Sequence, residues 1–206
     1  MAANSNDIRV KRTKKLIRQG LVELAETKRI NKITVKELTD HIEINRGTFY
    51  LHYKDVFDLV ESLENELYED FDTKLSSYTG EALLKTPEDV CEDFCTHFFE
   101  HKDLYSALLG INGDAHFAYK LGERLSERVH EIFKSIFPGM DETTYELTYN
   151  YCKFGLIGLI QSWYTKHTDW TPRQIAEMWL RVTTLGIWGV IGEEGKEVLL
   201  NAKNSR

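Results

Sequence analysis

The chain has 206 residues, 42% of them hydrophobic and 29% charged, which is enough apolar mass for one or two folded domains. Three cysteines without regular spacing exclude a disulfide framework, and the absence of a signal-peptide pattern or an apolar run of roughly 18 residues predicts a cytoplasmic protein with no membrane partner. The net charge of −7 is unevenly spread, because residues 1–60 carry 12 Lys and Arg against 8 Asp and Glu, whereas the rest carries 14 against 25. This asymmetry suggests a basic module joined to an acidic body, although charges that only solvate helix faces would look the same.

Apolar residues recur at intervals of three and four, and no stretch alternates over strand length, so the sequence predicts an all-α fold. Helix starts are marked by capping boxes or N-caps, and stops by Gly and Pro. The start signals are Thr34, Asn45, Asp55, Thr86-Pro87, Thr143 and Thr171-Pro172, and the stops are Thr79-Gly80, Asn112-Gly113 and Pro138-Gly139.

These marks predict about nine helices, the first three short and locally packed and the others long. Their expected ranges are 8–28, 34–41, 45–52, 55–77, 87–101, 103–109, 114–137, 143–166 and 171–191. We expect an N-terminal three-helix domain over 1–54 and a larger C-terminal helical domain over 55–206, connected by the helix that begins at Asp55.

The segment 34–53, TVKELTDHIEINRGTFYLHY, is typical of a helix-turn-helix with its turn at Glu43-Ile44. Its apolar positions are spaced to close over a small core supplied by the first helix. They are Val35, Leu38, Ile42, Ile44, Phe49 and Tyr53, packed on Ile17, Leu21 and Leu24. A second helix that begins at Asn45 would then project its first residues into a major groove.

The polar residues of this segment face outward in that arrangement. Arg46 can pair with guanine, the Thr48 methyl group can touch a thymine methyl group, and Gly47 lets the backbone approach closely. Phosphate contacts suit four other side chains, Thr34, Tyr50, His52 and Lys54. The alternative is a helical hairpin used only for packing, which the outward Tyr50 beside Arg46 and His52 makes a poor explanation.

Residues 8–65 resemble the TetR/AcrR (tetracycline-repressor-like) family, and the run INRGTFYLHYKD over 44–55 is the specific part of the match. The resemblance implies a regulator of transcription that binds double-stranded DNA. It implies base contacts near Lys36, Arg46, Gly47, Thr48 and Tyr50, and phosphate contacts near Thr34, Leu51, His52 and Lys54, with Asn45 at the start of the recognition helix.

Two residues depart from the family pattern. Members often carry Gly in the turn, where this chain has Glu43, so Glu43 must tolerate the turn geometry. They usually carry a phosphate-binding Lys three residues after the position of Tyr53, where this chain has Val56. We expect this loss to remove about one phosphate contact, which Val56→Lys would restore unless Val56 packs beneath Tyr53.

The last two predicted helices carry small residues beside large apolar ones, a pattern that favours close helix packing between two subunits. The expected dimer interface is Gly155, Gly158, Leu159, Ser162, Trp163, Val182, Leu185, Gly186 and Gly189. A two-fold dimer would let two short recognition helices read two half-sites of a palindrome. Ordinary packing within one subunit is the alternative.

Aromatic residues of the middle helices are candidates for a pocket that takes a small-molecule effector, although plain core packing explains them equally. They are Tyr68, Phe94, Phe98, Tyr105, Phe117 and Tyr149. On a helix, Cys91 and Cys95 do not converge with His97 and His101, so no metal site is expected; the two cysteines are better explained as buried apolar residues than as a thiol sensor.

No phosphate-binding loop, dinucleotide motif, zinc-protease motif or catalytic triad order occurs, so the sequence predicts neither an enzyme nor a cofactor. The leading hypothesis is a homodimeric, ligand-responsive repressor that binds a palindromic operator in the nucleoid. The alternative is a TetR-like coactivator that binds a partner protein through its acidic body. Operator, effector and sign of regulation are not encoded in any motif.

Overall fold

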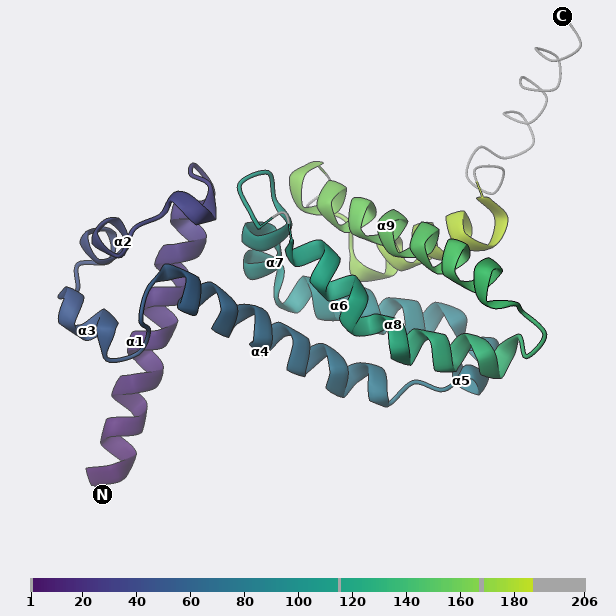
Figure 1. Ribbon diagram of the computed structural model, residues 1–206, viewed down its shortest axis with the longest axis horizontal. Coiled ribbons are helices and arrows are strands. Elements are labelled where there is room, and N and C mark those ends of the chain that lie inside the picture. Colours follow the sequence, from purple (N-terminus) through teal and green to yellow (C-terminus); the bar gives the residue numbers. More distant parts are fainter. Residues whose placement is uncertain (1, 115, 167–168, 187–206) are drawn as a thin grey trace, which may run out of the picture. The chain divides into compact units, whose positions relative to one another are not determined.

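The computed structural model describes residues 2–114, 116–166 and 169–186 (Figure 1). Within these ranges every regular element is a helix, which confirms the predicted all-α fold. None of the described helices is long and apolar enough to cross a membrane. The chain divides into two compact units, one made of Met1–Leu75 with Lys102–Leu125 and the other of Ser76–His101 with Ser126–Arg206.

This division groups the chain differently from the predicted boundary at 54/55, because α4 and the segment 102–125 cluster with the N-terminal helices. The two compact units show which residues pack together and not which residues bind DNA. The functional boundary therefore stays a prediction.

The first unit begins with helix α1 and the short helices that pack on it. Its elements are α1 (Ala2–Ala25), the single 3₁₀ turn η1 (Ile30–Lys32), α2 (Val35–His41), α3 (Arg46–Tyr50), α4 (Val56–Ser76), α7 (Lys102–Leu109) and the first part of α8 (Phe117–Ile136). Gly20 lets α1 and α2 approach closely, since a Cβ atom there would lie 2.3 Å from the Ile42 side chain. Ile17, Leu21 and Phe49 are completely buried in this small core, as predicted.

The turn between α7 and α8 is tied to the end of α1 by Asn112. Its side-chain amide donates hydrogen bonds to the carbonyl oxygens of Ala25 and Glu26, both at 3.1 Å. The backbone carbonyl oxygen of Asn112 accepts from the backbone N–H of Ile30 at 2.8 Å. The carbonyls at a helix C-terminus lack partners within the helix, so Asn112 supplies donors where α1 needs them.

The second unit consists of α5 (Gly80–Lys85), α6 (Pro87–Glu100), the rest of α8, α9 (Glu142–Lys166) and a last described helix over 172–186. Helix α6 contacts α9 and the last described helix. The Tyr164 hydroxyl group of α9 donates to the Phe98 carbonyl at 2.7 Å, and Phe99 stacks on Trp163 at 5.7 Å. Arg173 of the last helix pairs with Glu92 at 2.8 Å.

Four predicted helix starts are confirmed by hydrogen bonds. Thr34 forms a complete capping box with Glu37, and Asn45 caps α3. The Asp55 carboxylate accepts from the Asp58 N–H at 2.9 Å, and Thr171 and Gln174 bond reciprocally at 2.9 and 3.3 Å. These caps depend on residues three positions apart or fewer, which is why the sequence reveals them.

Three further marks lie at helix boundaries, as predicted, but their capping differs from the prediction. Thr79-Gly80 starts α5 rather than only ending α4, because the Thr79 hydroxyl accepts from the Ala82 N–H at 3.2 Å. Thr86 makes no side-chain cap, since its hydroxyl donates back to the Ala82 carbonyl at 3.3 Å. Helix α9 begins at Glu142, where Asp141 takes the capping role predicted for Thr143 by accepting from the Thr144 N–H at 3.1 Å.

Candidate nucleic-acid interface

Helix α2 is fixed at its start by a network around Thr34. The Thr34 hydroxyl accepts from the Glu37 N–H at 3.2 Å, while Glu37 accepts from the Thr34 N–H at 3.0 Å. Hydrogen bonds from Lys28 and then from Thr34 lower the pKa of the Glu37 carboxyl to about 2. The charged carboxylate is therefore held in place at neutral pH, and Thr34 keeps an exposed position at the N-terminus of the helix.

The turn between α2 and α3 runs through Glu43 in a left-handed conformation, with φ of 55°. The Ile44 N–H then donates to the Thr39 carbonyl at 3.0 Å, which closes the turn. A residue with a side chain at positive φ is strained, so the expectation that Glu43 must tolerate the turn geometry describes a real local cost.

Helix α3 is short and is held from both ends. The Asn45 side-chain oxygen accepts from the Gly47 N–H at 2.7 Å, and the buried Phe49 ring packs edge-on against Tyr50 and at a tilt against Tyr53. Lys14 of α1 places its ammonium group 5.9 Å from the centre of the Tyr53 ring. Burying Phe49 fixes the rotation of α3 and so determines which of its residues face outward.

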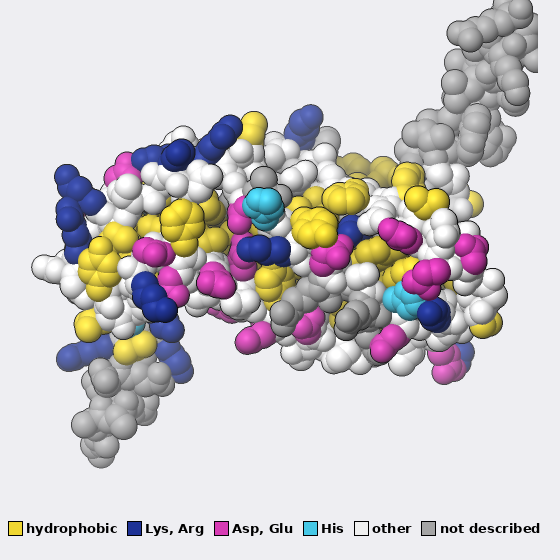
Figure 2. All heavy atoms as spheres, viewed as in Figure 1, with side chains coloured by type: hydrophobic (Ala, Val, Ile, Leu, Met, Phe, Trp, Pro, Cys, Tyr) yellow, Lys and Arg dark blue, Asp and Glu magenta, His cyan; other side chains and the backbone are white. Residues whose placement is uncertain are grey.

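The residues predicted to contact DNA lie on the surface of the first unit. Eight of them are exposed: Thr34, Lys36, Asn45, Arg46, Gly47, Tyr50, Leu51 and Lys54. Thr48 and His52 are half-buried. In the view of Figure 2, most visible Lys and Arg side chains lie over the N-terminal helices. This surface offers a guanidinium group, hydroxyl groups and ammonium groups in the pattern that suits base and phosphate contacts.

Val56 does not lie on that surface. Only 6% of it is exposed, at the first position of α4, whereas the following residue, Phe57, is 68% exposed. This burial favours the alternative, that Val56 packs in the core, over a phosphate-contacting position.

Helix α9 is apolar on two opposite faces. One face, with Tyr145, Tyr149, Leu156, Ile160 and Trp163, is buried in the second unit. The opposite face, about 180° away at roughly 100° per residue, exposes Leu147, Tyr151, Phe154, Gly155, Gly158 and Ser162. A Cβ atom added at Gly155 or Gly158 would meet nothing within 4 Å, so this second face has no partner within the described residues.

The predicted dimer residues divide accordingly. Trp163 is only 2% exposed and its indole N–H donates to the Trp170 carbonyl at 2.9 Å, so it belongs to the core of its own unit rather than to the open face. Leu159 and Val182 are half-buried, and Leu185 is exposed. Gly186 has a positive φ of 63°, and Gly189 lies outside the described residues.

The six effector-pocket candidates form separate clusters. In the first unit, Phe117 stacks on Tyr68 at 5.8 Å and contacts Tyr105 at 6.1 Å. In the second unit, Phe94 contacts Phe98 at 5.9 Å and Trp179 at 5.6 Å, and Tyr149 stacks on Tyr145 at 5.9 Å. The buried indole nitrogen of Trp179 has no hydrogen-bond partner in the described part of the chain.

The cysteines of α6 are buried. Burial raises the pKa of Cys91 to about 11 and that of Cys95 to about 12, so neither is a thiolate at neutral pH. His97 and His101 lie together, with ring centres 4.9 Å apart. Among the residues that the structure describes, no group of three or more His, Cys, Asp or Glu could hold a metal ion.

Comparison with known proteins agrees with this geometry. Residues 85–185 match a TetR family model described as "Transcriptional regulator C-terminal region". The uncharacterized HTH-type transcriptional regulator YxbF of Bacillus subtilis strain 168 is 23% identical over 96 residues, 45% of this chain. The match spans about a quarter, 25%, of the length of that relative.

Two solved structures share the fold. A TetR transcriptional regulator from Streptococcus agalactiae 2603V superposes with a TM-score of 0.61 and 19% identity, covering 88% of this chain and 98% of its own. NalD, the secondary repressor of the MexAB-OprM multidrug efflux pump in Pseudomonas aeruginosa, gives a TM-score of 0.59 and 18% identity over 86% of this chain and 97% of its own. Residues 85–185 therefore belong to the C-terminal region of TetR-family transcriptional regulators, and the described chain has the fold of that family.

Proposed function

We propose that the protein is a sequence-specific repressor that binds a palindromic operator as a homodimer. One observation carries the DNA part of this proposal: the buried Phe49 and the Asn45 cap orient α3 so that Arg46 and Tyr50 face outward. The similarity to NalD, a repressor, supports the sign of regulation. In this role the protein would act on the nucleoid in the cytoplasm.

The DNA-binding proposal is tested by selecting bound fragments from genomic DNA. We expect one enriched palindrome, and diffuse enrichment would contradict the proposal and favour a regulator that acts through a partner protein. On the selected operator, Arg46→Ala should cost about 1–3 kcal/mol and relax preference at one base pair. Lys54→Ala should weaken binding to all sequences alike and reduce the salt slope by about 0.9.

Lys166→Ala, which removes an exposed cation at the end of α9, is the matched control and should leave both quantities unchanged. If Arg46→Ala and Lys54→Ala lower the affinity for operator and random DNA by the same factor, then Arg46 does not read bases.

The homodimer proposal rests on the open apolar face of α9. A helix that is apolar on opposite faces needs a partner for each, and the described residues cover only one. Tyr151 and Phe154 supply large apolar area on the open face, and Gly158 between them and Ser162 allows a second helix to come close. Two copies of this face form an isologous interface.

Gly158→Leu tests the interface without disturbing the subunit, because a side chain at Gly158 enters open space. We expect overpacking between subunits to weaken the dimer by roughly 1–3 kcal/mol while the fold is retained. Light scattering would measure the mass, which should be twice 24.0 kDa for the unaltered protein. Glu146→Leu, at an exposed position on another face of α9, is the control. A monomeric unaltered protein at micromolar concentration would rule the dimer out.

We also propose that a small-molecule effector controls DNA binding. The aromatic clusters around Phe117 and around Phe94 are the candidate contacts, and the indole N–H of Trp179, which has no partner among the described residues, is a donor available to such a ligand. A library screen for compounds that release the protein from the selected operator tests this part.

A further inference from the structure

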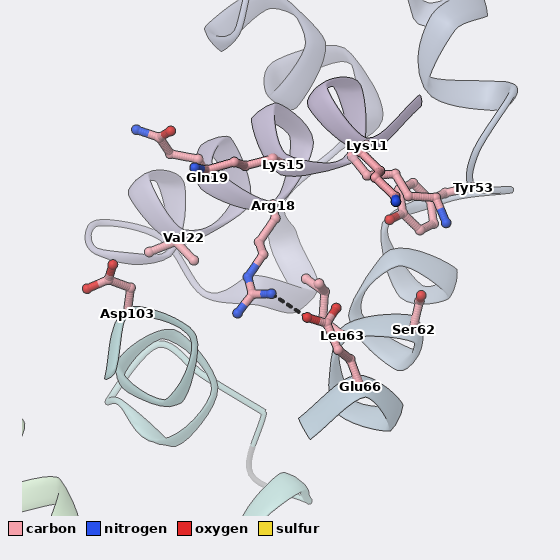
Figure 3. A pocket seen from close by; sticks show the side chains of 11 residues that line it. Lys11, Lys15, Arg18, Gln19, Val22, Tyr53, Ser62, Leu63, Glu66 and Asp103 are labelled. Carbon is pink, nitrogen blue, oxygen red and sulfur yellow. Dashed lines mark hydrogen bonds and ion pairs between the residues drawn. The ribbon is translucent and has the colours of Figure 1, made fainter. Parts of the chain in front are cut away.

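A groove of about 540 Å³ lies within the first unit, between α1, α4 and the start of α7 (Figure 3). This volume is within the range of about 300–1,000 Å³ typical of small-molecule sites. Arg18 reaches from α1 across the groove to Glu66 of α4, and the two are joined at 2.6 Å. Val22 and Asp103 lie on one side of this ion pair, and Tyr53 and Ser62 lie on the other.

The lining of the groove carries an excess of positive charge. Four cations, Lys11, Lys14, Lys15 and Arg18, face two carboxylates, those of Glu66 and Asp103. Within the described residues neither Lys14 nor Lys15 pairs with a carboxylate. The Lys14 ammonium lies over the Tyr53 ring instead. The groove therefore has positive charge available for an anion.

The guanidinium group of Arg18 has N–H donors without an acceptor among the described residues. Its side chain is 29% exposed, and among the described residues only its Nη1 atom has an acceptor, the Glu66 carboxylate. An arginine presents five N–H donors in a planar fork, which matches the paired oxygens of a carboxylate or phosphate group. One edge of this fork is thus open to a second anionic group.

The uncharged part of the lining consists of apolar Val22 and Leu63, the Tyr53 ring, and polar Gln19 and Ser62. Leu63 and Tyr53 are only 3% and 6% exposed, so the apolar surface open to a ligand is that of half-buried Val22 and of the aliphatic stems of exposed Lys14 and Lys15. A bare inorganic ion would leave these surfaces uncovered, whereas an organic molecule would cover them while its charged group meets Arg18.

We propose that this groove binds a small organic anion, with one carboxylate or phosphate group on a compact apolar body. The anionic group bonds to the open edge of Arg18 and is attracted by Lys15, in competition with Glu66, and the body lies against Val22 and the aliphatic stems of the lysines. This site goes beyond the proposed DNA and effector contacts, and its test needs no DNA.

Phenyl phosphate is the probe, with calorimetric titration and thermal melting of the full chain at fixed ionic strength as the measurements. We expect saturable binding and a rise in melting temperature that increases with probe concentration. Benzyl alcohol, which lacks the charge, and inorganic phosphate, which lacks the apolar body, should both bind at least about tenfold more weakly.

Two variants should change the affinity in opposite directions. Arg18→Gln should weaken phenyl phosphate binding by about tenfold or more, because it removes a charge-assisted fork. Glu66→Gln should tighten it by about two- to fivefold, because it frees Arg18 from its competitor. Arg29→Gln, an exposed cation of the same unit outside the groove, should have no effect.

The opposite signs keep the test independent of any loss of stability, since both variants break the same ion pair. Equal affinity in the unaltered protein and Arg18→Gln, or equal binding of inorganic phosphate and phenyl phosphate, overturns the proposal. It is also overturned if phenyl phosphate does not bind while Lys14→Gln with Lys15→Gln lowers the salt slope of DNA binding. That result would assign the cations to the phosphates of a duplex.

Discussion

Replacing Val56 by Lys distinguishes a packing role from a DNA-contacting role at the start of α4. The residue is 6% exposed, so the substitution removes a buried aliphatic side chain and brings an ammonium group to the same place. Burial of a Val side chain is worth roughly 1.5–3 kcal/mol. A lysine can extend its ammonium group toward water and recover part of this loss, which leaves an expected net cost of about 2 kcal/mol.

Thermal melting measures this cost. For a chain of this length, about 2 kcal/mol corresponds to a fall in melting temperature of roughly 4–8 °C. Phe57→Lys is the matched control, because it places the same charge one residue later at a position that is 68% exposed. We expect Phe57→Lys to melt within about 2 °C of the unaltered protein, as surface substitutions generally do.

DNA binding at several salt concentrations completes the comparison. The charge at position 57 should steepen the dependence of log K on log salt by up to about 0.9, while the charge at position 56 should not. The reasoning is refuted if Val56→Lys melts like the unaltered protein and steepens the salt dependence by about 0.9, since Val56 would then face DNA.

Two further predictions concern stability. Glu43→Gly should raise the unfolding free energy by about 0.5–1 kcal/mol, because the strain of φ at 55° exceeds the entropic cost of glycine; chemical denaturation should show an upward shift, and a downward shift would contradict the argument. Glu64 is 2% exposed and its Oε1 atom has no hydrogen-bond partner in the described residues, so desolvation raises the pKa of its carboxyl above 4.5. The protonated Glu64 carboxyl therefore contributes stability that is full below pH 4.5 and is lost as the pH rises through the raised pKa. Glu64→Gln does not titrate and can still accept from Lys120. We expect this variant to show a flatter dependence of melting temperature on pH above 4.5. An unchanged pH profile would count against this assignment.

The helix-turn-helix could be predicted from sequence because its determinants are local. The Thr34 box and the Asn45 cap each connect residues no more than three positions apart, and the inward residues follow the helical period. The same reasoning predicted the break at Thr79 but not the helix that starts there, because a Thr-Gly pair suits the end of one helix and the start of another equally well.

Contacts between segments far apart in the sequence could not be predicted from local patterns. Arg18 and Glu66 are 48 positions apart, and Asn112 bonds to a carbonyl 87 positions earlier. Nothing in the local pattern around these residues marks the groove or the tie to α1. Trp163 shows the related difficulty, because a helix with two apolar faces has no single periodic stripe that tells the inner face from the outer one.

The dimer and the operator proposals depend on each other physically. Helix α3 has five residues, Arg46–Tyr50, and so can present only a few side chains to base edges. Specific binding then requires two copies at a fixed separation on the duplex. Gly158→Leu leaves α3 intact and should reduce the preference for the palindrome over a single half-site, whereas Arg46→Ala leaves α9 intact and should relax the base preference within each half-site. If Gly158→Leu weakens the dimer and still prefers the palindrome as strongly as the unaltered protein, α9 does not set the spacing of the recognition helices.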